Sequence, residues 1–356
     1  MEFIVLSTSF EAVAVIDTYE SAIWTERFFS AGDVEITMAM PNPIQSYLLA
    51  GNYISLVGSD EVMTIEHSAL STDDENGDLW TVTGTAQSAL LYRRIIFPQL
   101  TIAGNFQTGV KTLLDRNLIS PTDASRRIPN FVFGTSSDSS VTTLTVDNQY
   151  TGDNLYASIQ KLCVERNIGF KVTMPVRGTR RFTLYAGKDH TYKQSTNPYI
   201  VMSPGYDNLG QSNYVQDISN HRTVAYVGGE GEGTARTWVV ASGDAAAGTG
   251  LSRREIYVDA RDLSSQLGNG NTIPPATYSS QLRNRGLTEL TEDKEVKAFD
   301  AEVLNTGLYK FGEDFGMGDI VQLENEYGMT AEVRVTEYIR SMESGVYTEF
   351  PSFSVM

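Results

Sequence analysis

The sequence has little of what most metal and redox centres require. It contains one cysteine, Cys163, and three histidines, His67, His190 and His221, which lie far apart. A single cysteine excludes an intrachain disulfide and a cysteine-based zinc site, and we expect Cys163 to be a buried apolar residue in a helix. The histidines show no HExxH spacing, so we interpret them as packed or surface residues. The sequence therefore predicts no metal centre and no cofactor.

Motifs of catalysis and phosphate binding are also missing. No GxSxG elbow occurs. The glycine-rich residues 228–233 include two glutamates and precede a predicted strand, whereas a phosphate-binding loop opens a helix. The acidic run 73–78 lacks the ligand spacing of an EF-hand, and Asn76-Gly77 within it predicts a hairpin turn. Carboxylates are numerous, but nothing singles out a glycosidase pair. We expect a protein that is not an enzyme.

Basic residues are in the minority, and long apolar runs are absent. The 356 residues carry 27 basic against 44 acidic side chains, a formal net charge of −17. Such a chain is poorly suited to specific nucleic-acid binding, although acidic walls can surround DNA without holding it. The alternative is that acidity only maintains solubility. No apolar run approaches the roughly 20 residues that span a bilayer, and Glu2 does not suit a secretion signal. We expect no transmembrane segment and folding in a cytoplasm.

The N-terminal part of the sequence predicts strands, and the next part mixes strands and helices. Residues 2–84 contain short β-branched and aromatic runs separated by turn signals, which is typical of a small barrel or sandwich. Helical patterns follow at 86–96 and 106–119, and Asp153 is the expected cap of a third helix. Arg177-Gly178 predicts the turn of a later hairpin.

The C-terminal part begins with a predicted hairpin. Residues 223–227 and 236–241 are expected to be its strands, joined through the glycine-rich tip. Pro275 predicts the first turn of a helix, which Gly286 weakens by about 1 kcal/mol relative to alanine. Further strands are expected at 295–304, 318–323, 331–342 and 346–350. The whole pattern predicts a β-rich α+β fold.

A charged segment at 253–262 is the one candidate for a functional surface. Six of its ten residues are charged, with mixed signs. One interpretation is an exposed edge whose charges pair across strands and block unwanted pairing. The other is a contact between protomers, where charges set register and exclude wrong partners. The candidate assembly residues are Arg253, Arg254, Glu255, Asp259, Arg261 and Asp262.

Three groups of segments together resemble a known family. They are residues 23–29 (IWTERFF), 32–36 (GDVEI) and 90–96 (LLYRRII); then 225–231 (AYVGGEG), 253–255 (RRE) and 258–262 (VDARD); then Tyr309, Gly312, 318–321 (GDIV) and 333–337 (VRVTE). In this order, over nearly the whole chain, they resemble the tail-hub proteins of long-tailed bacteriophages, also called baseplate-hub or tail-associated-lysin N-terminal proteins.

The resemblance implies a structural virion protein without a catalytic site in this region. Family members form a homotrimeric hub at the distal tip of the tail, which links the tail tube to tip and host-recognition components and surrounds the DNA exit channel. The implied partners are further copies of the chain, distal-tail or tail-tube ring proteins, the tape-measure protein, and tip or receptor-binding proteins. The implied location is the phage tail tip, after assembly in the host cytoplasm.

The resemblance also implies a division into domains. Two β-barrel-like tube domains per chain would give six similar units in a trimer, which matches a six-fold tube above a three-fold tip. The expected parts are a first barrel-like domain at 1–85, an α+β annex at 86–215, a second barrel-like domain at 216–262 plus 295–356, and a helical insertion at 263–294. The annex and the insertion would face outward.

A different class of function fits the same composition. The chain has 18 tyrosines, and a β-rich module that binds host-surface carbohydrate would display aromatic side chains clustered on one face. This alternative and the structural hub differ in where exposed aromatics lie.

Overall fold

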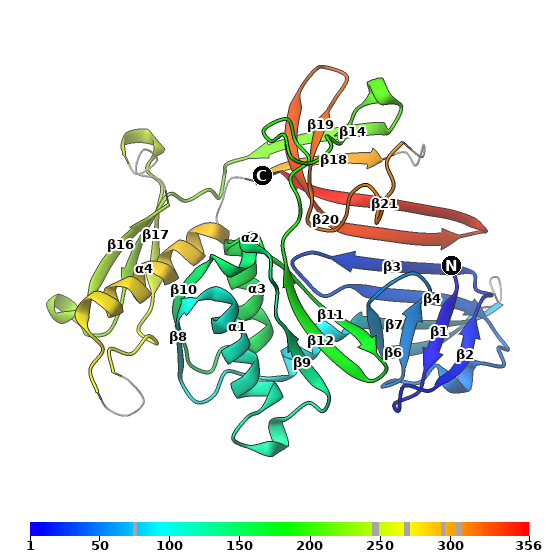
Figure 1. Cartoon of the computed structure of the whole chain (residues 1–356), viewed down its shortest axis with the longest axis horizontal. Helices are drawn as coiled ribbons and strands as arrows, with labels where there is room; N and C mark the ends of the chain where they lie inside the picture. The colour runs from blue at the N-terminus through cyan, green and yellow to red at the C-terminus, as the bar shows by residue number, and fades with distance from the viewer. Residues whose placement is uncertain (74–76, 244–248, 267–270, 293–295, 304–307, 356) are drawn as a thin grey trace.

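An open sheet of eleven strands forms the largest part of the protein. The computed structural model describes residues 1–73, 77–243, 249–266, 271–292, 296–303 and 308–355. The strand order is β13-β19-β20-β3-β4-β7-β6-β5-β1-β2, and β21 also pairs with β20 (Figure 1). The strands are β1 (Phe3–Leu6), β2 (Ala12–Ile16), β3 (Ser21–Arg27), β4 (Asp33–Ala39), β5 (Tyr53–Leu56), β6 (Val62–Asp73), β7 (Gly77–Ala86), β13 (Val201–Met202), β19 (Ile320–Glu324), β20 (Thr330–Glu343) and β21 (Val346–Val355).

The two ends of the chain meet within this sheet. β3 pairs antiparallel with both β4 and β20, and Trp24 lies opposite Arg340 in the register. The alternation along β3 buries Ala22 and Trp24 in the N-terminal core. The prediction of a β-rich α+β fold is confirmed, but the path of paired strands is open and ends at β13 and β2. These described strands form no closed barrel.

The annex has its own hydrophobic core, built from short helical elements and strands. The helical elements are a 3₁₀ helix at Gln87–Arg93, α1 (Phe106–Leu114) continuing as a π-helical turn at Asp115–Ile119, α2 (Ser139–Thr142) and α3 (Leu155–Glu165). The strands are β8 (Leu100–Asn105), β9 (Phe131–Gly134), β10 (Thr145–Tyr150), β11 (Gly169–Val176) and β12 (Thr179–Tyr185). β11 and β12 form the hairpin predicted at Gly178. Cys163 lies fully buried in α3, as expected, and burial raises the pKa of its thiol.

Two local predictions in the annex need correction. The helical pattern of 86–96 forms only the short 3₁₀ helix, because the following residues pair as extended chain, with Ile95 bridged to Asn154. The cap of α3 is Asn154 and not Asp153. The side chain of Asn154 accepts a hydrogen bond from the Ala157 amide at 3.2 Å, whereas Asp153 accepts one from the Thr151 amide. An amide oxygen satisfies the free N–H of a first turn as well as a carboxylate does.

The remaining strands form two smaller sheets. β14 (Leu209–Asp217) pairs with β18 (Val296–Val303), which lies against β21. β15 (Val224–Gly228) lies between β16 (Trp238–Ser242) and β17 (Glu255–Asp259). Within 216–262, Gln216 and Asp217 at the end of β14 pair with β18, whereas the described strands that follow form the separate β16-β15-β17 sheet. The four-part domain division remains a prediction. Short 3₁₀ turns lie at Gln45–Tyr47, Ala124–Arg126, Pro204–Tyr206, Gly233–Ala235 and Gly250–Ser252.

Helix α4 (Pro275–Glu292) covers one face of the β16-β15-β17 sheet, at the end of the molecule opposite the N-terminal strands (Figure 1). The helix begins at the predicted proline. Its Tyr278, Leu282 and Leu290 pack with Ala225 and Val227 of the sheet in one buried cluster. The prediction of a hairpin followed by a helix is therefore confirmed, and the two elements pack on each other.

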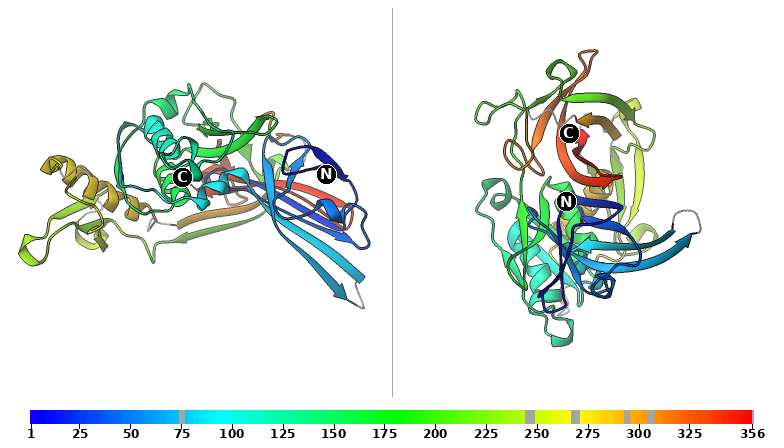
Figure 2. Two further views of the ribbon diagram at one scale, coloured as in Figure 1. Left: turned by 90° about the horizontal axis from the view of Figure 1, so that it is seen from below. Right: turned by 90° about the vertical axis from the view of Figure 1, so that its right-hand side faces the viewer.

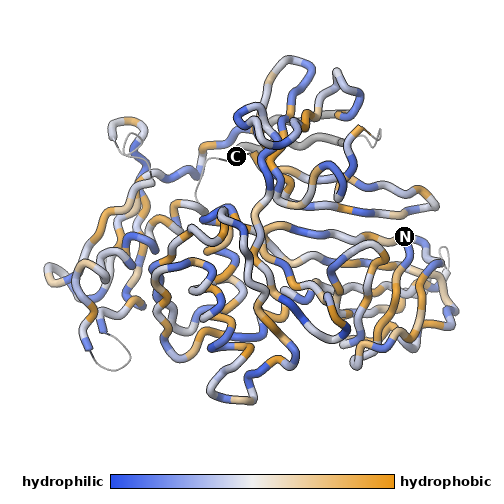
Figure 3. Tube along the Cα trace, in the orientation of Figure 1, coloured by the Kyte–Doolittle hydropathy of each residue, from blue (hydrophilic) through white to orange (hydrophobic). Residues whose placement is uncertain are grey.

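The overall shape is extended, with projecting hairpins. The long hairpin of β6 and β7 reaches away from the other strands (Figure 2), and Asp73 pairs with Gly77 at its end. Hydrophobic positions gather in the N-terminal strands, in the annex and in the sheet under α4 (Figure 3). Among the described helices, none combines the length and apolar character that crossing a bilayer requires.

Candidate assembly surface

The face of the β16-β15-β17 sheet opposite α4 is exposed and aromatic. Side chains alternate across a strand, so the residues between the buried positions point away from the helix. On this side Trp238, Tyr226 and Tyr257 are 51%, 36% and 52% exposed. Tyr226 stands opposite Val240 on one neighbour and Tyr257 on the other. We call this surface, with Glu255, Asp259 and Val240, the outer face.

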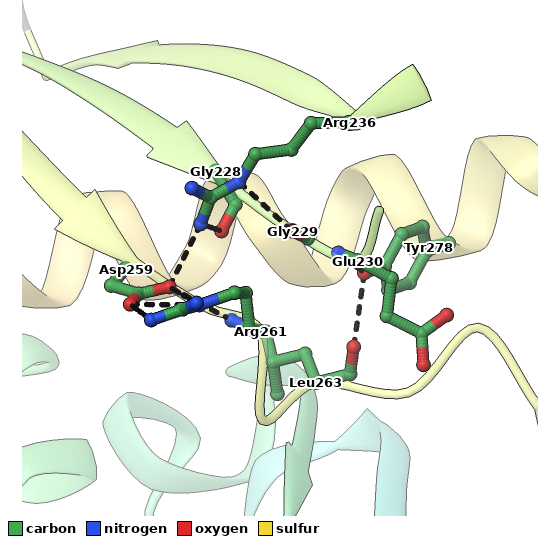
Figure 4. Close-up of polar contacts among 8 residues, drawn as sticks. All are labelled: Gly228, Gly229, Glu230, Arg236, Asp259, Arg261, Leu263 and Tyr278. Atoms are coloured by element: carbon green, nitrogen blue, oxygen red, sulfur yellow. Dashed lines mark hydrogen bonds and ion pairs between the residues drawn. The ribbon is translucent and has the colours of Figure 1, made fainter. Parts of the chain in front are cut away.

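Arg236 lies at the end of the outer face where β15 and β17 end, beside Gly228 and Asp259 (Figure 4). Its Nη2 donates to the Gly228 carbonyl and to Asp259 Oδ1, at 2.9 and 2.8 Å, and its Nε donates to the Gly229 carbonyl at 3.2 Å. The guanidinium carbon lies 5.1 Å from the ring centre of Trp238 and 5.6 Å from that of Tyr257. Cation–π contacts of this kind hold the rings and the cation in one arrangement.

Glycine at position 228 is what lets Arg236 lie there. A Cβ atom on Gly228 would be 2.6 Å from the guanidinium carbon of Arg236, a separation that real Cβ contacts do not show. The arginine thus occupies the space above the glycine, beside the rings of Trp238 and Tyr257, whose centres are 5.9 Å apart. Gly228 of the glycine-rich segment therefore leaves the space that the Arg236 side chain occupies.

Asp259 and Arg261 form the second part of the charged cluster. Arg261 donates from Nε and Nη2 to the Asp259 carboxylate, with 2.6 Å for the shorter contact to Oδ2 (Figure 4). The hydrogen bond from Arg261, supported by Arg236, lowers the pKa of Asp259. The carboxylate is thus ionised and shared between two arginines, Arg236 beside the aromatic rings and Arg261 at the rim of the outer face.

Arg253 and Glu255 form a separate pair at the other end of β17. Arg253 Nε donates to Glu255 Oε1 at 2.5 Å, and Nη2 donates to the Tyr226 hydroxyl at 2.8 Å. Its guanidinium also lies 5.6 Å from the centre of the Tyr226 ring. The hydrogen bond to Glu255 raises the pKa of Arg253. These contacts fix Tyr226 in the plane of the outer face.

The other two predicted residues point elsewhere. Arg254 donates through Nη1 to the Ile218 carbonyl, and its backbone N–H donates to Thr223 Oγ1 at 2.9 Å, so it ties β17 to the chain before β15. Asp262 accepts from Arg285 of α4 at 3.0 Å. The structure thus brings four of the six predicted residues to the outer face, whereas Arg254 contacts the chain before β15 and Asp262 contacts α4.

The glycine-rich tip is fixed by the helix below it. The Tyr278 hydroxyl accepts from the Glu230 amide and donates to the Leu263 carbonyl, both at 2.9 Å (Figure 4). Glu230 also accepts from Ser265 Oγ at 2.5 Å, and this hydrogen bond lowers its pKa. β15 and β16 pair antiparallel on either side of this tip, so the interpretation as a hairpin is confirmed.

Sequence reasoning missed the aromatic part of this surface. Trp238, Tyr226 and Tyr257 lie on strands whose opposite side carries Ala225, Val227 and Val258, so both faces of the predicted hairpin are apolar. A hairpin that is apolar on both sides needs a cover for each. Helix α4 covers one side. The apolar residues of the other side were the sequence signal from which an exposed aromatic surface could have been predicted. No group of three or more His, Cys, Asp or Glu side chains suited to a metal occurs in the part of the chain that the structure describes.

Solved structures of phage tail proteins share this fold over their whole length. A tail protein from Neisseria meningitidis MC58 is 12% identical, with a TM-score of 0.58 over 99% of this chain and 96% of that chain. The prophage tail protein gp18 from Listeria monocytogenes EGD-e is 12% identical, with a TM-score of 0.56 over 100% and 94%. The 43 kDa tail protein of prophage MuSo2 from Shewanella oneidensis is 10% identical, with a TM-score of 0.54 over 100% and 98%. The fold is therefore that of phage and prophage tail proteins.

The sequence family agrees with this class. Residues 2–350 match the family described as Siphovirus ReqiPepy6 Gp37-like protein, and the chain belongs to this family. No curated protein matches the chain in sequence. The expectation of a tail protein of long-tailed phages is confirmed by the family together with the fold.

Proposed function

We propose that this protein is a non-enzymatic hub at the distal tip of a phage tail, and that three copies form a ring around the DNA exit channel. The ring would join the tail tube to tip and host-recognition components, with distal-tail, tape-measure and receptor-binding proteins as neighbours. Its location would be the tail tip of the virion. Family and fold support a tail protein, and the outer face supports assembly.

The composition of the outer face is the observation that carries the proposal. Trp, Tyr and Arg are the residues that dominate binding energy in protein interfaces, particularly where a packed arrangement excludes water. Trp238, Tyr257 and Arg236 are held together by cation–π contacts and a shared carboxylate before any partner arrives. Because few side chains need to be ordered on binding, the entropic cost of association is reduced.

A ring of three requires a contact between two different surfaces. Three-fold symmetry is generated by heterologous contacts, in which one patch meets a different patch on the next copy. The outer face would be one of these patches, with Arg261 at its rim, 64% exposed in its side chain. Rim charges act mainly on association rate and on the choice of partner.

The acidity of the chain fits a channel for DNA. With a net charge of −17, walls built from this protein repel phosphate and leave a passing duplex unbound. This part of the proposal requires acidic side chains on the inner wall of the ring. A reconstruction of the assembled ring with a neutral or basic lumen would contradict it.

Light scattering of the purified protein tests the ring directly. We expect the mass of a trimer for the unchanged chain and a shift toward monomer for Arg261→Glu, which places two carboxylates side by side. The matched control is Arg181→Glu on β12, an equally large charge change at an exposed position of the annex. A strictly monomeric species at high concentration, or equal behaviour of both variants, would count against the proposal.

The same aromatic cluster also meets the condition for the carbohydrate-binding alternative. Tyr226, Trp238 and Tyr257 lie exposed on one face, and sugar rings stack on such platforms. A glycan array with the unchanged chain and with Trp238→Ala separates the two functions. Specific binding that is lost in the variant would favour the module, and no binding with a trimeric mass would favour the hub.

A further inference from the structure

A second surface, independent of the outer face, is a cleft between the N-terminal strands and the annex. Its volume is about 880 Å³, within the range of small-ligand sites. One wall comes from the turn after β1 and from β5 and β6, and the other from the 3₁₀ helix, the chain before β9 and the start of β12. Hydroxyl and amide groups line much of it, namely those of Thr8, Ser9, Thr64, Tyr53 and Asn130.

The charge of this cleft is opposite to that of the chain. Its charged lining consists of Arg93, Arg94 and Arg180 against one acid, Glu66. In the whole sequence acids outnumber basic residues by 44 to 27. Guanidinium groups that line one cleft repel one another and attract anions.

Arg180 is the deepest of these cations, and its partners are all neutral. It is 9% exposed, and its Nε, Nη1 and Nη2 donate to Gln87 Oε1, to the Pro129 carbonyl and to the Tyr53 hydroxyl, at 2.8, 3.3 and 2.9 Å. No carboxylate of the described residues lies within ion-pair distance of it. The partly buried Arg27 and Arg340 do have such partners, in Glu337 and Glu26. Buried charges are normally paired, so Arg180 lacks a counter-ion.

Arg180 still has donors to offer. A guanidinium carries five N–H groups in a planar fork, and the three contacts above leave two of them. Its guanidinium carbon lies 4.9 Å from the ring centre of Phe10, which stacks on Tyr53 at 4.5 Å. The packing holds the fork in one orientation, which suits bidentate recognition of a carboxylate or phosphate.

Arg93 and Arg94 stand at the mouth of the cleft. Arg93 contacts Glu66 at 3.4 Å. Arg94 donates to the carbonyl groups of Arg126 and Arg93, and burial together with the charges of Arg126 and Arg93 lowers its pKa. In the protein without a bound ligand, the positive charges of these arginines repel each other. An anion between them would relieve that repulsion.

We propose that this cleft binds an acidic saccharide, whose carboxylate or phosphate group contacts Arg180 and Arg94. The buried guanidinium without a counter-ion selects the oxyanion. The hydroxyl and amide groups of the walls, with the Phe10 and Tyr53 rings beside them, suit the hydroxyls and the apolar edges of sugar rings. A carboxylate and a phosphate make the same contact, and binding experiments distinguish these two sources.

The test is calorimetric titration of the full chain with three short ligands. They are a uronic-acid oligomer, a sugar-phosphate oligomer and a neutral oligosaccharide of similar length. We expect binding of one or both acidic ligands, at least tenfold weaker at high salt, and none of the neutral ligand. Arg94→Ala should weaken binding tenfold or more, and Arg180→Lys, which keeps the charge but loses the fork, should also weaken it. Arg116→Ala, an exposed arginine after α1, is the matched control and should bind normally.

Several outcomes would overturn the proposal. These are the absence of heat with both acidic ligands, equal affinity for the neutral one, or unchanged binding in Arg94→Ala. Equal affinity for inorganic phosphate alone would contradict the saccharide and leave only a general anion contact. The light-scattering mass of the same samples is read separately, so a failure here is distinct from a failure of the trimer.

Discussion

A Cβ atom added to Gly286 in helix α4 would lie 2.6 Å from Cγ2 of Val227 in strand β15. The same atom would lie 2.9 Å from the Cβ of Ala241 on the neighbouring strand. The helix therefore meets the sheet with a glycine against Val227 and Ala241, which lets helix and sheet approach closely.

Replacing Gly286 by alanine tests which of two effects is larger. Alanine favours a helix by about 1 kcal/mol over glycine, but a methyl group forced into a packed contact typically costs about 1–3 kcal/mol. Because both neighbours are themselves held in the sheet, we expect Gly286→Ala to destabilise the protein. Urea unfolding measures the change. Arg283→Ala, at an exposed position of the same helix, should stay within about 0.5 kcal/mol, and a stabilised Gly286→Ala would show that the contact yields.

Two tyrosines of equal exposure should differ in their effect on assembly. Tyr257 on the outer face is 52% exposed and Tyr206 in a 3₁₀ turn is 54% exposed. We expect Tyr257→Ala to weaken the proposed trimer by about 2 kcal/mol or more, as hot-spot tyrosines do, and Tyr206→Ala to leave it unchanged. Sedimentation over a range of concentrations measures both. If the two variants dissociate alike, the outer face is not the contact.

Glu61 should give the protein a characteristic pH dependence. It is 6% exposed, and burial together with the charge of Glu26 raises its pKa from 4.5 to about 8. Between these values the folded state keeps a proton that the unfolded state has lost. This contribution to stability is therefore complete below pH 4.5 and falls by up to about 1.4 kcal/mol per pH unit until pH 8.

Glu61→Gln removes this titration, because glutamine resembles the protonated acid. The variant and the unchanged protein should unfold at similar urea concentrations at pH 4.5, and the variant should be more stable at pH 7.5. The difference between the two proteins cancels the pH effects of all other groups. Parallel stability curves across this range would mean that Glu61 is ionised when folded.

The ion pair of Arg340 and Glu26 should couple the two ends of the chain. Arg340 Nη1 lies 2.9 Å from Glu26 Oε1 across the β3–β20 pair, and the side chains are only 16% and 17% exposed. Glu26 also accepts from Trp24 and Ser59. A double-mutant cycle with Arg340→Ala and Glu26→Gln should give a coupling energy of about 1–3 kcal/mol. The more exposed Lys193 and Glu332 pair should give less than about 1 kcal/mol, and equal couplings would contradict a special role for the β3–β20 pair.

Local features of the fold could be predicted from the sequence because they depend on neighbours in the chain. The hairpin of β15 and β16, the start of α4 at Pro275 and the turn at Gly178 all follow from turn residues and side-chain periodicity. The cap of α3 was predicted one residue too early, since Asp153 and Asn154 are both good caps and only the backbone path selects one. Two of the charged candidates could be placed on one face for the same reason, and the role of all six in assembly stays a prediction. Glu255 and Asp259 share a face by alternation, whereas the orientations of Arg254 and Asp262 depend on Ile218 and Arg285.

What the sequence alone determined is the class of the protein: a cysteine-poor, acidic, β-rich chain without a recognisable catalytic motif, whose ordered segments resemble phage tail proteins. The tertiary structure decided how distant segments meet. The pattern of side chains along a strand indicates which side is buried but not which strand becomes its neighbour. The pairing of Trp24 with Arg340 therefore could not be predicted from the sequence. The same holds for Arg236 above Gly228 and for Arg180 in its cleft, because burial and hydrogen bonding of a guanidinium depend on atoms brought together only when the whole chain has folded.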